Sequence, residues 1–281
     1  MRVTSHGHAC VALHHGGHVV VLDPGVYSDA AGALRDADTV LITHLHPDHV
    51  DPSALGAALA ARGGLTVWAP ESVVAGLRPV VPDDAATRLR VVSPGDRITL
   101  GGLVVVVGGG QHAVIHRDVP RIANVTYLVR ADGATLLHPG DSFDAPGTDV
   151  LGGRRLDVLL APVSAPWLKL AETIDFVRAL DPRVVVPIHD AILSDAGHGL
   201  VHRLLGENRT GGTYAYRPLA RGESLDVAAG SLDGTADAAA QELLSEHPEF
   251  AEVHLLEGDE TVPPRPEEQV ADVARDAPDG R

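Results

Sequence analysis

The sequence predicts an α/β fold in which helices cover a core of β-sheet. Short apolar runs with strand character recur along the first 228 residues, and several helical segments separate them. Turn-forming stretches such as His-Gly-Gly, Pro-Gly and Asp-Gly punctuate these runs. Hydrophobic residues make up 44% of the chain but aromatic residues only 3%, so Val, Leu and Ala must build the core.

The N-terminal part of the sequence predicts four strands and two helices. Residues 11–25, "VALHHGGHVVVLDPG", indicate two strands joined at the two glycines, and "TVLIT" at 39–43 has the composition of a short buried strand. The helix over 51–64 has clear ends, because Asp51 is a good N-cap, Pro52 suits the first helical position and Gly63 suits the stop. A strand at 66–70 and a short helix at 71–77 follow.

The second half repeats the pattern of strands and helices. Residues 88–112 form a run of strands broken by Pro-Gly and Gly-Gly, and residues 124–141 form a hairpin around Asp132-Gly133, a dipeptide that favours such turns. Strand, helix and strand follow at 155–162, 171–182 and 183–190. A helix at 198–208 and strand character at 213–227 complete this part.

The composition changes near residue 229. The stretch 229–281 holds 14 acidic residues and three arginines, whereas the preceding part has a net charge of only −5. A marginal helix over 235–256 precedes an end rich in Pro and Glu, a composition typical of disorder. We predict one globular domain over 1–228 and an acidic, largely disordered or marginally helical tail over 229–281.

The charge balance argues against a nucleic-acid-binding protein. There are 38 acidic residues against 22 basic ones, a net charge of −16, and Lys169 is the only lysine. A net-negative chain repels phosphate backbones, so general nucleic-acid binding is disfavoured.

Three observations predict a soluble protein of a reducing compartment. No run approaches the roughly 18–20 apolar residues that a membrane span requires, and the N-terminus lacks the basic and apolar segments of a signal peptide. The single cysteine, Cys10, excludes an internal disulfide. We expect a cytoplasmic protein without a membrane partner.

The most informative segment is "THLHPDHVD", residues 43–51, with three histidines and two aspartates directly after a buried strand. In extended chain His44 and His46 leave the same face, about 7 Å apart along the strand, so both can bind one cation. A proline then turns the chain, and Asp48 and His49 can reach a second ion beside the first. Imidazole nitrogens with some carboxylate suit Zn²⁺ well, and Fe or Mn less exclusively.

One loop cannot complete such a site, because a hydrolytic metal ion needs about three protein ligands and an open position. Three further candidates follow apolar strands: His112 after "LVVVVGGGQ", Asp141 after "TLLHPG" and His189 after "VVVPI". Each would be ordinary alone. Together with the first cluster they predict a metal centre built from loops at a sheet edge.

This order of His-x-His-x-Asp-His, then His, then Asp in "GD", then His after a strand resembles the metallo-β-lactamase-fold hydrolases. "HGHACVAL" and "VLDPG" are similar to the opening strands of the ascorbate-phosphate-lactonase-like branch of that superfamily. The resemblance covers residues 3–225. It implies a four-layer αββα sandwich with a dinuclear metal site, most simply two Zn²⁺ per chain, along one edge.

The resemblance also implies two sets of ligands and a bridge: His44, His46 and His112 for the first ion, Asp48, His49 and His189 for the second, and Asp141 between them. The stretch "GQHAVIH" leaves an alternative, in which His116 replaces His112. We prefer His112, which follows the strand directly. For His8 a structural role is favoured over a place at the site edge, and His138 and Ser142 are expected to support the site rather than bind metal.

Such a centre implies hydrolysis of a small molecule with an ester, lactone or phosphodiester group by a hydroxide bound to two metal ions, which lower the pKa of a shared water. Asp48 is expected to orient that water and accept a proton as well as to bind metal.

A nuclease of the same fold and a non-catalytic metal-binding or regulatory protein are the alternatives. The acidic charge opposes a nuclease. So do the short spacings, 29 residues from His112 to Asp141 and 48 from there to His189, which leave no room for an inserted clamp. The complete ligand set opposes a non-catalytic protein.

A protein ending at residue 228 should keep its metal and its turnover, because the acidic tail holds none of the expected ligands. Metal content and turnover of the shortened and full-length proteins, measured side by side, check this expectation. A folded, metal-loaded shortened protein without turnover would contradict it. Loss of solubility alone would not, since charge aids solubility.

Overall fold

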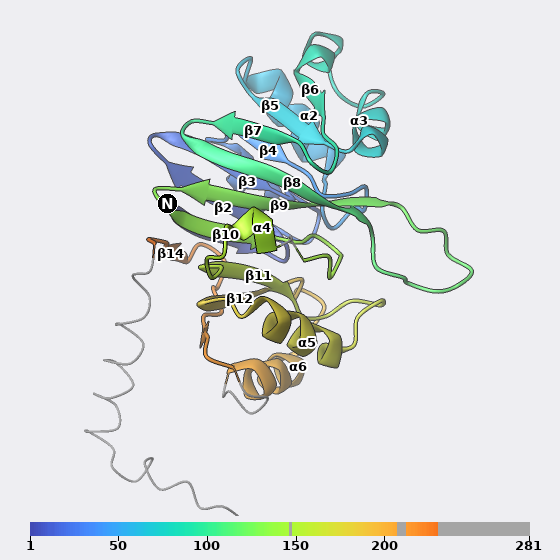
Figure 1. Cartoon of the computed structure of the whole chain (residues 1–281). Helices are drawn as coiled ribbons and strands as arrows, with labels where there is room; N and C mark the ends of the chain where they lie inside the picture. Colours follow the sequence, from blue (N-terminus) through green and yellow to red (C-terminus); the bar gives the residue numbers. More distant parts are fainter. Residues whose placement is uncertain (146–147, 207–211, 230–281) are drawn as a thin grey trace, which may run out of the picture. The chain divides into compact units, whose positions relative to one another are not determined.

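The computed structural model describes residues 1–145, 148–206 and 212–229, and two seven-stranded sheets form the centre of this body (Figure 1). The first sheet has the order β14-β1-β2-β3-β4-β5-β6. Its strands are β1 (Arg2–Gly7), β2 (Cys10–His15), β3 (His18–Leu22), β4 (Thr39–Leu41), β5 (Thr66–Ala69), β6 (Leu89–Val91) and β14 (Ser224–Asp226).

The second sheet has the order β13-β12-β11-β10-β9-β8-β7. Its strands are β7 (Arg97–Leu100), β8 (Leu103–Gln111), β9 (Ala123–Ala131), β10 (Ala134–His138), β11 (Val158–Pro162), β12 (Val184–Ile188) and β13 (Ala215–Tyr216). The hairpin predicted at Asp132-Gly133 joins β9 to β10, and both turn residues have positive φ, 50° and 79°. Aspartate tolerates a positive φ because its side chain is short and polar, and glycine does so because it lacks a side chain.

The helices belong to the two outer layers. They are α1 (Ala30–Leu34), α2 (Pro52–Ala61), α3 (Glu71–Leu77), α4 (Thr148–Leu151), α5 (Leu170–Leu180) and α6 (Asp195–Val201), with a 3₁₀ turn at Asp83–Arg88 and a π turn at His202–Gly206. Helix α2 begins as predicted, since the Asp51 carboxylate accepts hydrogen bonds from the backbone N–H groups of Ser53 and Ala54 at 2.9 and 3.1 Å. Within the described ranges, no helix has the length and apolar character needed to cross a membrane.

Three clusters of buried apolar side chains lie between the four layers, which are the two sheets and the helices on their outer faces. The central cluster, which includes Leu22 and Tyr127, joins the inner faces of the two sheets. A second cluster packs Leu55 and other residues of the first helices on the first sheet, and a third packs Phe176 of α5 on the second sheet. The predicted four-layer αββα sandwich is therefore confirmed.

The predicted tail lies, apart from Ala229, outside the described residues, so the division of the chain at residue 228 stays a prediction. Up to that point the chain is tied to the body. The backbone N–H of Val227 donates to the Met1 carbonyl at 2.8 Å.

Strand direction places the predicted site loops together. Strands β3 to β6 run parallel in the first sheet, and β10 to β13 run parallel in the second. Strand β8 shares the direction of β10, because both are antiparallel to β9. The loops after β4, β8, β10 and β12 therefore leave from carboxyl ends of strands, where sites on such sheets are usually built.

The loop after β4 rests on the loop after β3. The backbone N–H of Val26 donates to the Pro47 carbonyl, and that of Asp51 donates to the Pro24 carbonyl, both at 2.8 Å. A Cβ atom at Gly25, between these contacts, would overlap the carbonyl of Asp48. Only glycine permits this close approach of two backbones.

Gly25→Ala should therefore destabilise the protein by about 1–3 kcal/mol, because the added methyl group forces the two loops apart. Thermal unfolding followed by circular dichroism measures the effect. Gly63→Ala is the matched control, since no atom lies within 4 Å of a Cβ built there. Equal melting temperatures for the two variants would contradict the close packing of these loops.

Candidate functional site

All seven predicted ligands meet at one sheet edge, although they come from four loops. The loop after β4 supplies His44, His46, Asp48 and His49, and the loops after β8, β10 and β12 supply His112, Asp141 and His189. Five of these side chains are buried, and only His46 and Asp48 are half-buried.

The first group consists of His44, His46, His112 and Asp141, which each offer one ligand atom within 4.8 Å of the others. His44 Nε2 lies 3.1 Å from His46 Nδ1, and Asp141 Oδ2 lies 3.3 Å from His112 Nε2. Ligands that bind one ion at roughly 2.0–2.2 Å are separated by such distances. The alternative residue, His116, is exposed, and its Nδ1 faces the Asp118 carboxylate at 3.5 Å. The structure thus brings His112 and not His116 to this group.

The second group consists of Asp48, His49 and His189, joined by His8. Asp48 Oδ2 lies 3.3 Å from both His189 Nε2 and His8 Nε2, and 3.9 Å from His49 Nε2. His8, for which the sequence favoured a structural role, lies at the site itself. The signals for it in the sequence are its position directly after β1 and its place in the family-like stretch "HGHACVAL", because the contact with Asp48 itself spans 40 residues.

Asp141 connects the two groups. Its Oδ1 lies 2.9 Å from His49 Nε2 and its Oδ2 lies 3.3 Å from His189 Nε2, in addition to the contact with His112. Trp167 Nε1 donates to Asp141 Oδ2 at 2.9 Å, and the Asp141 backbone N–H donates to Asn124 Oδ1 at 3.0 Å. Sequence reasoning missed Trp167 and Asn124, since neither has a local pattern that indicates a partner.

A buried carboxylate, Asp23, supports the loop after β4 and was also missed. It accepts hydrogen bonds from the Thr43 backbone N–H at 2.8 Å and from the Thr43 hydroxyl at 2.7 Å, and it lies 2.7 Å from His49 Nδ1. These bonds draw Thr43 out of the strand, so β4 ends at Leu41 and His44 lies in a bend. The expectation of extended chain through His44 and His46 was therefore wrong.

Three residues of the site have left-handed backbone conformations that non-glycine residues rarely adopt: His8, Asp23 and His189 have φ values of 53°, 47° and 61°. The surrounding hydrogen bonds hold them there. One example is the His189 backbone N–H, which donates to the His8 carbonyl at 3.1 Å. Residues held in such conformations cluster at functional sites.

His138 and Ser142 support the chain on either side of Asp141. His138 Nε2 lies 2.9 Å from the Ala9 carbonyl, and its Nδ1 accepts from the Gly140 backbone N–H at 3.1 Å. Ser142 Oγ accepts from the Asp144 backbone N–H at 2.8 Å. Neither side chain belongs to the two donor groups.

The donor set fits metal cations. Four of its buried atoms, His49 Nε2, His112 Nε2, His189 Nε2 and Asp141 Oδ1, make no hydrogen bond of regular geometry within the described residues, although the three ring nitrogens lie 2.9–3.3 Å from the Asp141 carboxylate. Buried polar atoms are normally paired, and those left unpaired in a native site require an explanation. On the opposite ring edges, His112 Nδ1 and His189 Nδ1 each lie 2.6 Å from a backbone carbonyl, the arrangement that orients imidazole ligands.

Burial and charge have opposing effects on these groups. Burial lowers the pKa of His44 well below its usual value, and His49 lowers it further. Burial has the same effect on His49 and His189, but the surrounding carboxylates outweigh it, raising the pKa of His49 and bringing that of His189 to about 9. Burial opposes ionisation of Asp141, yet the imidazoles hold its pKa well below the usual range. Because a cation must displace protons from His49 and His189, its affinity falls as the pH falls.

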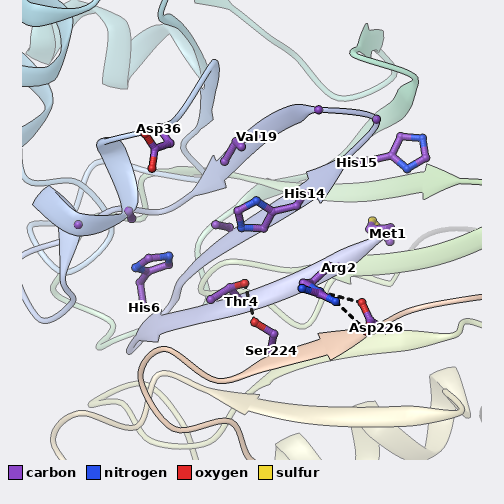
Figure 2. A pocket seen from close by; sticks show the side chains of 15 residues that line it. Met1, Arg2, Thr4, His6, His14, His15, Val19, Asp36, Ser224 and Asp226 are labelled. Atoms are coloured by element: carbon purple, nitrogen blue, oxygen red, sulfur yellow. Dashed lines mark hydrogen bonds and ion pairs between the residues drawn. The ribbon is translucent and has the colours of Figure 1, made fainter.

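A larger cavity, about 730 Å³, lies elsewhere, on the outer face of β1 and β2 (Figure 2). Four of its polar side chains are paired with one another: Arg2 Nε lies 2.9 Å from Asp226 Oδ1, and Thr4 Oγ1 lies 2.9 Å from Ser224 Oγ. None of the buried unpaired atoms of the described residues belongs to its lining. We therefore place the functional site at the two donor groups. They contain buried unpaired donor and acceptor atoms, and the lining of the larger cavity contains none.

Similar proteins are known for most of this chain. The family described as beta-lactamase superfamily domain matches residues 2–189. The Mycobacterium tuberculosis protein Rv0786c is 36% identical over 212 residues, which cover 75% of this chain and 93% of the relative. A UPF0173 metal-dependent hydrolase, TK0141 of Thermococcus kodakarensis, is 27% identical over 192 residues, 65% of this chain and 81% of the relative.

Solved structures show the same fold at low sequence identity. The metallo-β-lactamase fold protein YhfI of Bacillus subtilis superposes with a TM-score of 0.61 at 14% identity, over 80% of this chain and 98% of that one. Together with the family match and the Mycobacterium relative, this shows that the chain belongs to the beta-lactamase superfamily and has the metallo-β-lactamase fold.

Proposed function

We propose that this protein is a hydrolase that uses two divalent cations, most simply Zn²⁺, on a small molecule with an ester, lactone or phosphodiester group. The observation that carries the proposal is the pair of donor groups that meet at Asp141 and contain four buried atoms without a hydrogen bond of regular geometry. The description of the Thermococcus relative as a metal-dependent hydrolase supports it.

The donor groups suggest which residues bind which ion. The first ion would be bound by His44, His46 and His112, the second by Asp48, His49 and His189, and Asp141 would bridge them. Imidazole with carboxylate suits Zn²⁺, while Mn or Fe would also accept these ligands.

Two cations bound there would supply a hydroxide nucleophile at neutral pH and polarise the bond to be broken. Asp48 is half-buried and lines a small cavity of about 210 Å³ beside the second group, so its carboxylate can orient the attacking water and accept its proton. Trp167 donates to the Asp141 carboxylate, and Asn124 accepts from the Asp141 backbone N–H, so that both the side chain and the backbone of Asp141 are held. The remaining ring nitrogens of His49, His112 and His189 are fixed by Asp23 and two backbone carbonyls, which sets the direction of each imidazole.

Asp141→Ala should lose the second metal more readily than the first, because three imidazoles still hold the first ion. Turnover should fall by orders of magnitude, since the Asp141 carboxylate would hold both cations and offset part of their repulsion. Metal analysis of the purified wild-type protein should give about two equivalents per chain. Turnover of a generic ester or of a bis-phosphodiester should disappear with a chelator and return with metal.

Asp144→Ala is the control, because this aspartate is exposed and belongs to neither donor group. Metal content, circular dichroism and turnover are measured on both variants. If Asp141→Ala keeps two metals and near-normal rates, the assignment of the bridge is wrong. A wild-type protein that binds two metals but hydrolyses no ester, lactone, thioester or phosphodiester would instead be a non-catalytic metal-binding protein.

A further inference from the structure

The loop after β11, residues 163–169, reaches the two donor groups although it supplies none of their members. Strand β11 pairs in parallel with β10 and β12, so this loop leaves the same sheet edge as the loops after those strands. Two contacts tie it to the second donor group. The Val163 backbone N–H donates to the Ile188 carbonyl at 3.0 Å, and the Ser164 carbonyl lies 2.6 Å from His189 Nδ1. The loop is therefore held beside the site.

Trp167 is the residue of this loop that contacts the donor groups. Its side chain is buried, with 9% exposed, and its indole packs edge-on against Phe143 at a distance of 5.3 Å between ring centroids. The ring centroids of His112 and His189 lie 5.8 and 6.3 Å from that of the indole. A buried tryptophan usually has a partner for its N–H. Here the partner is Asp141 Oδ2, at 2.9 Å.

This bond is the one hydrogen bond of regular geometry that the Asp141 carboxylate accepts in the part of the chain that the structure describes. The other close groups are imidazole nitrogens. His49 Nε2 lies 2.9 Å from Oδ1, and the Nε2 atoms of His112 and His189 each lie 3.3 Å from Oδ2. A ring nitrogen that binds a cation has lost its proton and cannot donate. With cations bound, Trp167 is therefore the donor that remains for this carboxylate among the described side chains.

The bond restricts the one freedom that Asp141 retains. Its backbone is fixed on both sides, because its N–H donates to Asn124 Oδ1 at 3.0 Å and its carbonyl accepts from the Ala113 N–H at 2.8 Å. The terminal torsion of an aspartate is broad, so the carboxylate itself can still turn. The Trp167 N–H selects the orientation in which Oδ2 lies between the two donor groups, where it is 3.3 Å from an imidazole of each.

An indole suits this place better than a charged donor. Its N–H donates but accepts nothing, so the ring cannot compete for a proton or a cation. A lysine or arginine at residue 167 would neutralise Asp141 and repel two neighbouring cations. The neutral N–H leaves the negative charge of Asp141 to the cations. The bond is nevertheless strong, since hydrogen bonds to ionised acceptors are about twice as strong as neutral ones.

We infer that Trp167 is a positioning residue, whose indole N–H keeps Asp141 Oδ2 between the two donor groups and thereby strengthens the binding of the second cation. The inference rests on the proposed pair of cations and deepens it. The second cation depends on the orientation of Asp141 more than the first does. Both carboxylate oxygens lie near imidazoles of the second group, those of His49 and His189, whereas only Oδ2 lies near the first group.

Trp167→Phe keeps an aromatic ring and removes the N–H. Trp68→Phe is the matched control, because Trp68 is the only other tryptophan, lies in β5 and makes no hydrogen bond through its indole within the described residues. Full-length proteins freed of metal are titrated with Zn²⁺ against a chromophoric chelator, which gives the two stepwise dissociation constants. Trp167→Phe should weaken the second step by about 10–100-fold, the usual effect of removing a partner of a metal ligand, and leave the first nearly unchanged. Trp68→Phe should leave both steps unchanged.

The indole signals in NMR give a readout that packing alone would not change. Isotope-labelled tryptophan should give two indole N–H signals, and Trp68→Phe identifies the signal of Trp167. This signal should shift when Zn²⁺ binds and stay protected from exchange with heavy water in the loaded protein, because the bond to Asp141 persists. Circular dichroism checks that the variants are folded. If Trp167→Phe does not fold, the indole signal decides the inference.

The outcomes separate the two proposals. Equal zinc constants for Trp167→Phe and the wild type, equal losses in both steps, or a Trp167 signal that Zn²⁺ does not shift would overturn the inference and leave the hydrolase function standing. Two bound zinc ions without turnover of any ester or phosphodiester would contradict the hydrolase function, and the zinc constants would still decide the inference. A wild-type protein that binds no second zinc ion would contradict both.

Discussion

The geometry of this protein's site depends on one buried carboxylate that does not belong to either donor group. Asp23 is fully buried, and its two oxygens bind the backbone and hydroxyl of Thr43 and the ring of His49. Through Thr43, whose hydroxyl lies 3.0 Å from His44 Nδ1, the same carboxylate also reaches the first donor group. A charge without solvent is tolerated only when such bonds are complete. The hydrogen bonds to the Asp23 carboxylate thus determine the path of the chain from the end of β4 into the loop that carries His44, His46, Asp48 and His49.

The site also contains strained backbone, since three of its residues have left-handed conformations. Asp23 itself, His8 and His189 are left-handed, and each is held by hydrogen bonds that also form part of the site. The apolar clusters above and below are ordinary, with Val, Leu and Ala in most positions. Three of the five non-glycine residues with positive φ in the described ranges thus belong to the site, and packing between the layers provides the stability that keeps them in place.

Most of the donor set could be predicted from the sequence, because each donor follows an apolar strand and parallel strands end at the same edge. The cap at Asp51 and the turn at Asp132-Gly133 were equally accessible, since their chemistry is local. The roles of Trp167, Asn124 and His8 were not, because they arise from contacts between loops distant in the chain. The bend at His44 could not be predicted for the same reason, because it is caused by the hydrogen bond from Thr43 to Asp23, 20 residues earlier in the chain.

The first and last strands of the described body are neighbours. Strand β1 pairs with β14, so that Arg2 lies opposite Asp226, and the pairing of Thr4 with Ser224 spans 220 residues. At roughly 5–20 residues per second, a ribosome needs about 10–45 s between these two strands. Throughout that interval the outer edge of β1 lacks its partner, and exposed strand edges are templates for association with other chains. Strand β14 thus covers the outer edge of β1 only late in synthesis, and until then the nascent chain exposes an edge that can associate with other chains.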